Sequence, residues 1–280
     1  MSADADIAAA RPVRAEPTAL ILRGAGAALA GASWLSAAIF GLYILAFYVL
    51  AAPQGRLGQW NHHLPGLYDP ARPGSTAAMA AHLAMGGLLL MAGPAQLVGA
   101  VRARWPAVHR WLGRAYVTAA GLAGLGGLIF ILTKGTIGGT PMNLGFGLYG
   151  VLMVLASVQA FRHARARRIV QHRAWAIRLF ALAVGSWLYR MDYGFWMVLA
   201  HGAGHDARFD GPFDVVMTVF FYLPNLVAAE LFIRAGRGAV HPAARLAAAG
   251  VLGLATVFIA FGSYYFTAYY WGPGILAALS

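Results

Sequence analysis

The chain has 280 residues, of which 60% are hydrophobic and only 11% are charged. A soluble domain carries about 25% charged residues, so this composition excludes a protein that faces water on all sides. The absence of cysteine excludes disulfide bonds, iron–sulfur clusters and thiolate metal sites. The net charge of +12 comes from arginines in short clusters between long apolar runs, which indicates membrane topology and not nucleic-acid binding.

Residues 1–26 contain charged side chains and no apolar core, so we predict a cytoplasmic tail there and not a cleavable signal sequence. Seven apolar runs follow, each close to the roughly 20 residues that a helix needs to cross a bilayer. The predicted spans are Ala27–Ala52, Thr76–Val101, Ala115–Thr133, Pro141–Phe161, Ala174–Ala200, Phe213–Ile233 and Leu246–Trp271. The sequence therefore predicts an all-α, polytopic membrane bundle: a single transmembrane domain over residues 27–271 and a short outer tail over residues 272–280.

Most of the 21 basic residues lie in the N-terminal tail and in the connections after the second, fourth and sixth predicted spans. The positive-inside rule places these segments in the cytoplasm, so the N-terminus is expected inside and the C-terminus outside. We expect a multi-pass protein of the bacterial inner membrane. Its expected partner is the lipid bilayer, and no nucleic-acid partner is expected.

Similar sequence motifs lie at the start of the third and fifth predicted spans: HRWLGR at residues 109–114 and HRAWAIR at residues 172–178. The similarity favours two parallel hairpins, spans 2–3 and 4–5, which would form a four-helix core. The alternative is that any arginine-rich inner loop has this appearance. Glycines in the third span, at Gly121, Gly124, Gly126 and Gly127, favour close helix contacts, and Pro94 and Pro224 are expected to kink the second and sixth spans.

Several short motifs resemble those of a known family. They are His82 with Gly86 and Gly87, Gly93-Pro94 with Gln96, HRWLGRAY at residues 109–116, HRxWxxR at residues 172–178, and Arg190. Together they resemble a bacterial membrane family, domain of unknown function 2306, over roughly residues 40–235. A later stretch, Leu223–Leu226 with Glu230, resembles longer members. The resemblance implies a polytopic membrane protein and implies no mechanism.

Two histidines, His109 and His172, lie near the inner ends of the third and fifth spans, at matching depth. A haem b held between helices needs one imidazole from each of two helices and cations for its propionates. Four arginines are placed for the second role: Arg110, Arg114, Arg173 and Arg178. The alternative is that these side chains contact lipid phosphates or loop carbonyls.

Other polar residues lie deeper in the predicted spans. His82 is expected inside the hydrocarbon, where it would bond a quinone carbonyl, a buried carboxylate or a neighbouring helix. Arg190 and Asp192, in the fifth span, face different directions on a helix. Asp192 is predicted to pair with His82 or His201, and Arg190 with Glu230 or an anionic ligand. These residues indicate a polar chamber in the bundle, and structural ion pairing is the alternative.

His201 and His205 with Asp206, together with His62 and His63, have a composition like that of a metal site. Gly202 and Gly204 argue against a helical pair of His201 and His205, and we predict no metal site. Two functions are compatible with the polar residues. The first is a b-type haem electron carrier linked to quinol or a partner protein. The second is a cofactor-free, proton-coupled or anion-binding transporter. An accessory or assembly subunit of a membrane complex is a further alternative, and the sequence leaves open whether the protein is an enzyme.

Overall fold

The computed structural model describes residues 16–62, 65–97, 99–235 and 241–280. Within these ranges every regular element is helical, as predicted. The predicted N-terminal tail up to residue 15 and the predicted outer residue His63 lie outside the described ranges.

The described residues form eleven α-helices, joined by turns and short 3₁₀ or π segments. The helices are α1 (Pro17–Tyr43), α2 (Pro73–Ala92), α3 (Gly99–Arg104), α4 (Pro106–Thr133), α5 (Gly139–Arg165), α6 (Ile169–Ala183), α7 (Gly185–Ala200), α8 (Pro212–Phe220), α9 (Leu223–Ala235), α10 (Pro242–Phe266) and α11 (Gly272–Leu279). Proline opens five of them, α1, α2, α4, α8 and α10. Proline suits this position because the first helical N–H has no intrahelical partner.

Six helical stretches of the described residues are long and apolar enough to cross a membrane. They are Pro17–Val49, Pro73–Ala92, Pro106–Thr133, Gly139–Arg165, Pro212–Glu230 and Pro242–Leu279, and they correspond to six of the predicted spans. The fifth predicted span is not one continuous helix, because it breaks at Val184 between α6 and α7. Gly185 follows the break, and a Cβ there would lie 3.2 Å from the Phe221 carbonyl oxygen, so the α8–α9 junction packs closely against this point.

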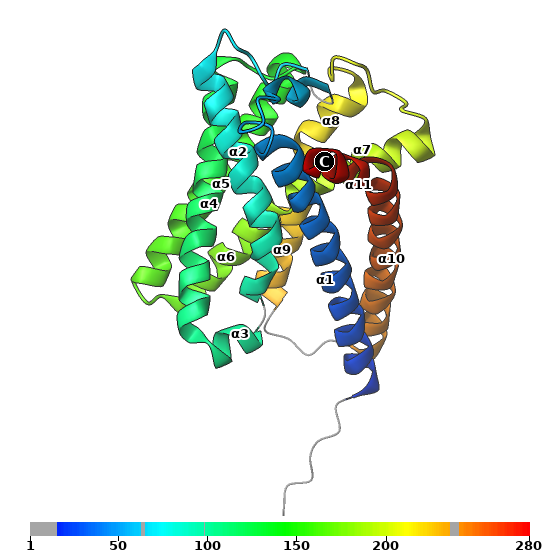
Figure 1. Cartoon of the computed structure of the whole chain (residues 1–280). Coiled ribbons are helices and arrows are strands. Elements are labelled where there is room, and N and C mark those ends of the chain that lie inside the picture. The colour runs from blue at the N-terminus through cyan, green and yellow to red at the C-terminus, as the bar shows by residue number, and fades with distance from the viewer. Residues whose placement is uncertain (1–15, 63–64, 98, 236–240) are drawn as a thin grey trace, which may run out of the picture.

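The ends of the chain differ from the predicted boundaries. Helix α1 begins at Pro17, inside the predicted tail, and continues beyond Tyr43 through a π-helical turn, Ile44–Val49. In this turn the Leu50 N–H donates to the Leu45 carbonyl at 3.1 Å, the i→i+5 pattern of a π-helix. Residues 272–279, predicted as a tail, form α11, which lies across one end of the bundle (Figure 1).

The expected proline effects are confirmed. Helix α2 ends at Ala92 and gives way to a 3₁₀ segment, Gly93–Leu97, that contains Pro94. The sixth span is interrupted after Phe220, immediately before Pro224 in the first turn of α9. In each case proline removes a backbone donor that a continuous helix would need.

The helices pack as two neighbouring groups. Helices α2, α4, α5 and α6 contact one another in succession, and α1 packs along α10 while also contacting α2 (Figure 1). Glycines make these contacts close. A Cβ on Gly126 of α4 would lie 2.6 Å from the Ala78 carbonyl oxygen of α2, and one on Gly41 of α1 would lie 2.8 Å from the Gly87 carbonyl oxygen. The close contact predicted for the glycine-rich third span is thereby confirmed.

The outer surface of the bundle is apolar. Leu132 is 83% exposed and Leu254 is 74% exposed, and many other large apolar side chains are exposed as well. A water-soluble monomer rarely presents so much contiguous apolar surface. Together with the length of the helices, it identifies a multi-pass membrane protein whose surface contacts lipid.

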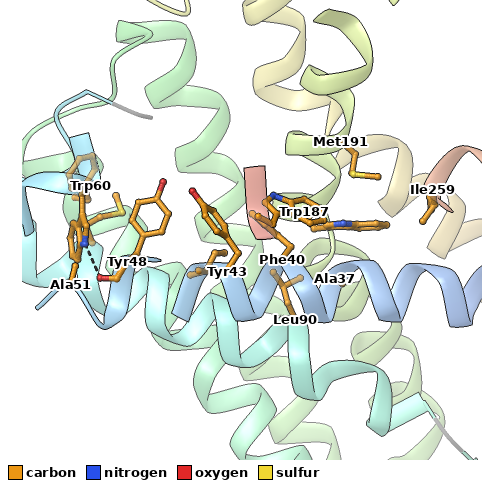
Figure 2. Packing of buried hydrophobic residues seen from close by; sticks show 14 residues of the cluster. Ala37, Phe40, Tyr43, Tyr48, Ala51, Trp60, Leu90, Trp187, Met191 and Ile259 are labelled. Carbon is orange, nitrogen blue, oxygen red and sulfur yellow. Dashed lines mark hydrogen bonds between the residues drawn. The ribbon is translucent and has the colours of Figure 1, made fainter. Parts of the chain in front are cut away.

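An aromatic core runs along α1 and positions the interior side chains. Figure 2 shows Phe40 and Tyr43 of α1 and Tyr48 of the following π-helical turn on one side of the helix, with the hydroxyl groups of both tyrosines on that side. The Trp60 indole N–H donates to the Tyr48 carbonyl at 2.8 Å, and the Trp187 indole N–H donates to the Ser36 hydroxyl at 2.9 Å. Both indole donors are therefore satisfied although they are buried.

Candidate functional site

A cavity of about 530 Å³ lies inside the bundle, between α1, α2, α4, α5 and α7. Its lining is mostly apolar and is rich in aromatic, methionine and glycine residues. A small number of polar side chains interrupt this lining: Tyr43, Tyr48, His82, Lys134, Thr136, Tyr149, Ser186, Tyr189 and Arg190. A mostly apolar pocket with a few polar groups is the usual form of a site for a small organic ligand.

His82 of α2 is fixed against α4. Its Nδ1 lies 2.7 Å from the Ala123 carbonyl oxygen, and because a carbonyl only accepts, Nδ1 carries the proton and Nε2 is left as an acceptor. Glycines of α4 make room for the ring, since a Cβ on Gly127 would lie 3.1 Å from Nδ1. Among the partners predicted for His82, the one that the structure shows bonded to it is the neighbouring helix.

Arg190 of α7 reaches the same cavity and lies within electrostatic range of His82. Its guanidinium carbon is 5.6 Å from the centre of the Tyr189 ring. Among the described residues no carboxylate lies within 4.0 Å of it. The predicted pairing with Glu230 is wrong, because the Glu230 carboxylate accepts from Arg178 at 2.6 Å. Arg190 thus presents a cation to an apolar interior, an expensive arrangement that marks functional groups in membrane proteins.

Asp192 is half-buried and lies away from this cavity. In the part of the chain that the structure describes, its carboxylate makes no hydrogen bond and no ion pair. Neither predicted partner of Asp192 contacts it. His82 bonds the Ala123 carbonyl, and His201, which caps α7 in the left-handed conformation, is exposed. The prediction that Arg190 and Asp192 face different directions agrees with this placement.

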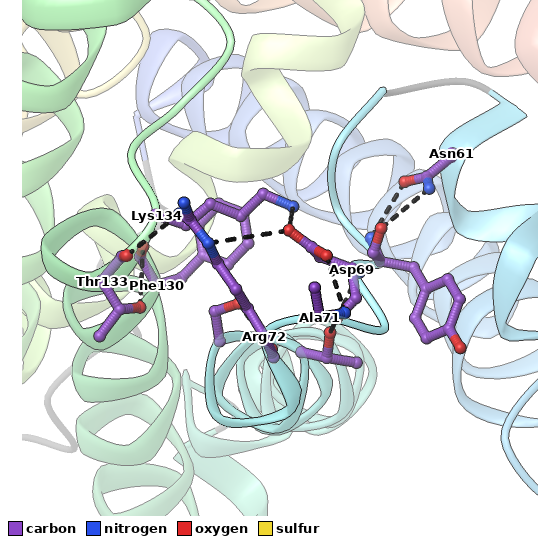
Figure 3. Close-up of polar contacts among 10 residues, drawn as sticks. Asn61, Asp69, Ala71, Arg72, Phe130, Thr133 and Lys134 are labelled. Atoms are coloured by element: carbon purple, nitrogen blue, oxygen red, sulfur yellow. Dashed lines mark hydrogen bonds and ion pairs between the residues drawn. The ribbon is translucent and has the colours of Figure 1, made fainter.

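Charged residues close one end of the cavity. Lys134, which follows α4, forms an ion pair of 3.1 Å with Asp69, and Arg72 lies 4.0 Å from the same carboxylate (Figure 3). The hydrogen bond from Lys134 is the largest cause that holds the pKa of Asp69 below its usual range, and the Ala71 N–H and Arg72 act in the same direction. These contacts tie the segment before α2 to the C-terminal end of α4, where Gly66 and Leu67 help to line the cavity.

The residue that the sequence analysis missed is Asp214. It is fully buried, and its carboxylate accepts from the Tyr193 hydroxyl at 2.7 Å, His205 Nδ1 at 2.7 Å, and the backbone N–H groups of Asp206 and Gly211, each at 3.1 Å. Asp214 therefore fixes the loop at residues 201–211, and Phe209 of this loop lines the central cavity. An acidic residue three positions into a proline-initiated helix is a capping signal that was present in the sequence.

The predicted inner residues occupy a separate region. His172 Nδ1 lies 2.9 Å from the Ala160 carbonyl oxygen, and His109 is within electrostatic range of His172. The buried Nδ1 of His109 and the buried Nε2 of Gln96 have no hydrogen-bond partner among the described residues. The residues that line the central cavity include neither histidine.

The four arginines that were predicted to hold the propionates do not converge. Arg178 pairs with Glu230 and stacks on Trp175 at 4.9 Å, while Arg114 stacks at 4.9 Å on Trp111, which is 68% exposed. Arg110 and Arg173 are also exposed. Three of these guanidinium groups therefore belong to the surface of the bundle, and the fourth has a carboxylate partner.

A comparison with the curated proteins and a comparison with the solved structures each gave no match. The comparison with family models gave one, over residues 79–233, which include α2 from Met79 onward and extend to Ile233 in α9. That region is more than half of the chain and contains His82, Arg190 and the two histidine–arginine motifs at residues 109–116 and 172–178. The chain therefore belongs to the family described as "Predicted membrane protein (DUF2306)".

Proposed function

We propose that the protein is a membrane transporter that binds a small organic anion with an apolar body in the central cavity. The observation that carries the proposal is Arg190, a guanidinium group that lines a mostly apolar cavity and has no carboxylate partner among the described residues. A bound carboxylate supplies the missing charge and accepts two parallel hydrogen bonds from the guanidinium.

The other polar groups suit the head of such a ligand. His82 keeps Nε2 free as an acceptor, so it accepts a hydrogen bond from a protonated acid or an ordered water. Ser186 and Tyr189, which lie near Arg190 along α7, add hydroxyl groups to the same wall. A volume of about 530 Å³ falls within the range of roughly 300–1,000 Å³ found for small-molecule sites.

The charged end of the cavity supports the sign of the ligand. Lys134 borders the cavity and shares Asp69 with Arg72, so two cations meet one carboxylate at this end of the cavity. An excess of positive charge beside a cleft raises the local concentration of anions. The potential at this end of the cavity therefore favours an anion over a cation.

The test is a binding measurement on the full chain in lipid nanodiscs, with octanoate as the anion and octanol as its neutral counterpart. Arg190→Gln should weaken octanoate binding by about tenfold, the cost of one lost charge-assisted contact, and leave octanol binding unchanged. The matched control is Arg208→Gln, because Arg208 is 82% exposed on the loop before α8. Equal octanoate affinity in wild type and Arg190→Gln would refute the proposal.

A second candidate is the b-type haem electron carrier, with His109 and His172 as iron ligands. One observation favours it: the Ala160 carbonyl holds the proton of His172 on Nδ1 and leaves Nε2 with the lone pair that a metal requires. The test is an oxidised-minus-reduced absorption spectrum of the purified chain from haem-replete cells. One haem per chain, lost in the His109→Ala/His172→Ala double variant, would support it, and a quinol partner would then be sought. A colourless protein would exclude it.

A further inference from the structure

The arginines of α3 to α6 form a surface that the proposed function does not use, in the lower part of Figure 1. Helices α4 and α5 pack against each other, as do α5 and α6, so the start of α4, the end of α5 and the start of α6 are neighbours. Nine exposed arginines lie there: Arg102, Arg104, Arg110, Arg114, Arg162, Arg165, Arg167, Arg168 and Arg173. Residues 70–191 contain no aspartate or glutamate, so the helices that carry this arginine cluster supply no carboxylate to it.

On α4, the depth of Arg114 matches that of lipid phosphates. Arg114 lies eight residues inside the helix, which begins at Pro106. Beyond it the large exposed side chains of α4 are apolar: Leu122, Leu125, Ile129 and Leu132. Lys134 follows the end of the helix, and the residues from Arg114 to Lys134 rise by about 30 Å at 1.5 Å per residue. The hydrocarbon core of a bilayer has this thickness, so the two cations lie at its two boundaries.

Helix α5 repeats the arrangement in the opposite direction. Its large exposed side chains recur every three or four residues on one face: Leu144, Leu148, Val151, Leu155, Val158 and Phe161. Arg162 and Arg165 follow directly and are exposed. From Leu144 to Arg162 the helix rises by about 27 Å, so these arginines also lie at the boundary of the hydrocarbon. Two lipid-facing helix surfaces therefore end in a pair of arginines each.

Exposed aromatic rings hold two of these arginines in place. The guanidinium carbon of Arg114 is 4.9 Å from the centre of the Trp111 ring, and that of Arg165 is 5.9 Å from the centre of the Phe161 ring. Neither guanidinium forms an ion pair with a described carboxylate. A stacked guanidinium keeps its N–H donors in the plane of the group, where they remain free to bind a phosphate.

Structural roles do not account for these arginines. Arg110 and Arg114 lie toward the N-terminus of α4, where the helix dipole disfavours cations. The positive-inside rule is satisfied by arginines in the connections between spans, yet Arg114 and Arg162 lie within the helical spans themselves. Exposed cations at this depth therefore need an anion that belongs to the bilayer.

We propose that this surface binds the phosphate groups of anionic phospholipids, with Arg110 and Arg114 of α4 and Arg162 and Arg165 of α5 as the contact residues. The acyl chains lie along the apolar faces of α4 and α5, which are continuous with the arginines and favour a lipid over a free phosphate. A zwitterionic lipid brings a cation of its own toward the cluster, whereas an anionic lipid adds negative charge alone. This inference does not depend on the anion site at Arg190.

The experiment is native mass spectrometry of the purified full chain in detergent, with phosphatidylglycerol and phosphatidylcholine of identical acyl chains as the two lipids. A cation close to an anionic lipid surface contributes about fivefold in affinity. Phosphatidylglycerol should therefore bind at least tenfold more tightly than phosphatidylcholine. Equal affinities for the two lipids would overturn the proposal.

The arginines are tested by the double variant Arg114→Gln/Arg165→Gln. It should weaken phosphatidylglycerol binding by about tenfold or more and leave phosphatidylcholine binding and the melting temperature unchanged, because both side chains are exposed. The matched control is Arg56→Gln/Arg208→Gln, which removes the same charge from two exposed arginines on loops outside the cluster. It should leave both affinities unchanged.

Two further results would contradict the proposal. An equal loss of phosphatidylglycerol binding in the control variant would mean that net charge alone, and not this surface, selects the lipid. Glycerol phosphate carries the phosphate without acyl chains, so it should not displace phosphatidylglycerol at equal concentration. Displacement at equal concentration would mean that the surface binds free phosphate and not a lipid.

Discussion

The contact between α2 and α4 offers a sharp test of the packing, because one glycine position cannot accept a methyl group while another on the same helix can. A Cβ on Gly126 would lie 2.6 Å from the Ala78 carbonyl oxygen and 3.0 Å from the His82 backbone nitrogen. Both are backbone atoms, so α2 as a whole must move. A Cβ on Gly121 would meet only the Ser157 Cβ, at an ordinary 3.9 Å.

The two alanine variants share one favourable effect and differ in one cost. Each exchange of glycine for alanine in a helix gains about 1 kcal/mol of helix propensity. Gly121→Ala keeps this gain, whereas Gly126→Ala offsets it with an overpacking cost of about 1–3 kcal/mol. The difference in the free energy of unfolding between the variants is therefore the overpacking cost itself. At about 2–4 °C per kcal/mol, Gly126→Ala should melt some 2 to 12 °C below Gly121→Ala.

The assay is thermal unfolding of both variants in one detergent, followed by intrinsic fluorescence, with octanoate binding measured in parallel. Displacement of α2 also displaces His82, so Gly126→Ala should bind octanoate more weakly than Gly121→Ala. A Gly126→Ala protein that melts at or above the temperature of Gly121→Ala would refute the close α2–α4 contact.

Three further outcomes are expected. Asp214→Asn should lower the unfolding free energy by about 2–3 kcal/mol, because an amide cannot accept from four donors; an unchanged melting temperature would contradict this. The folded state lowers the pKa of Asp69, so its contact with Lys134 stabilises the fold above the unfolded pKa of about 3.9 and this stabilisation is lost as pH falls through the folded value. The protection factors of the amides at residues 69–72, taken relative to the intrinsic exchange rate at each pH, should thus fall in acid, and in Asp69→Asn they should be low at every pH. A double-mutant cycle on Arg178→Gln and Glu230→Gln should give a coupling of about 1–2 kcal/mol, and a value near zero would argue against the pair.

The sequence was sufficient to predict the all-α class and six of the spans, because a bilayer imposes a length and composition that can be counted residue by residue. The break at Val184 was not predictable in this way. It coincides with the approach of the Phe221 carbonyl, which belongs to a distant segment, and a local pattern holds no record of that contact.

The same limit applies to the polar residues. The sequence indicated that His82 and Arg190 are important because a buried ionisable side chain is costly anywhere in a span. It did not identify their partners. His82 is held by a backbone carbonyl, which every residue possesses, and Glu230 pairs with Arg178 and not with Arg190. Asp214 was overlooked because its donors, Tyr193 and His205, become its neighbours only in the folded chain.

The π-helical turn at Ile44–Val49 makes the number of residues in α1, and not only their identity, a determinant of the cavity. Residues five apart point in well-separated directions on an α-helix, but the wider turn brings Tyr43 and Tyr48 to the same side (Figure 2). Deleting one residue between them would restore α-helical winding with the two tyrosines at i and i+4, still on one side. Inserting one further residue would instead rotate Tyr48 by about 100° away from the cavity and shift the register of everything that follows toward α2. Substitutions in the turn can be absorbed one side chain at a time, whereas an insertion alters the whole wall at once.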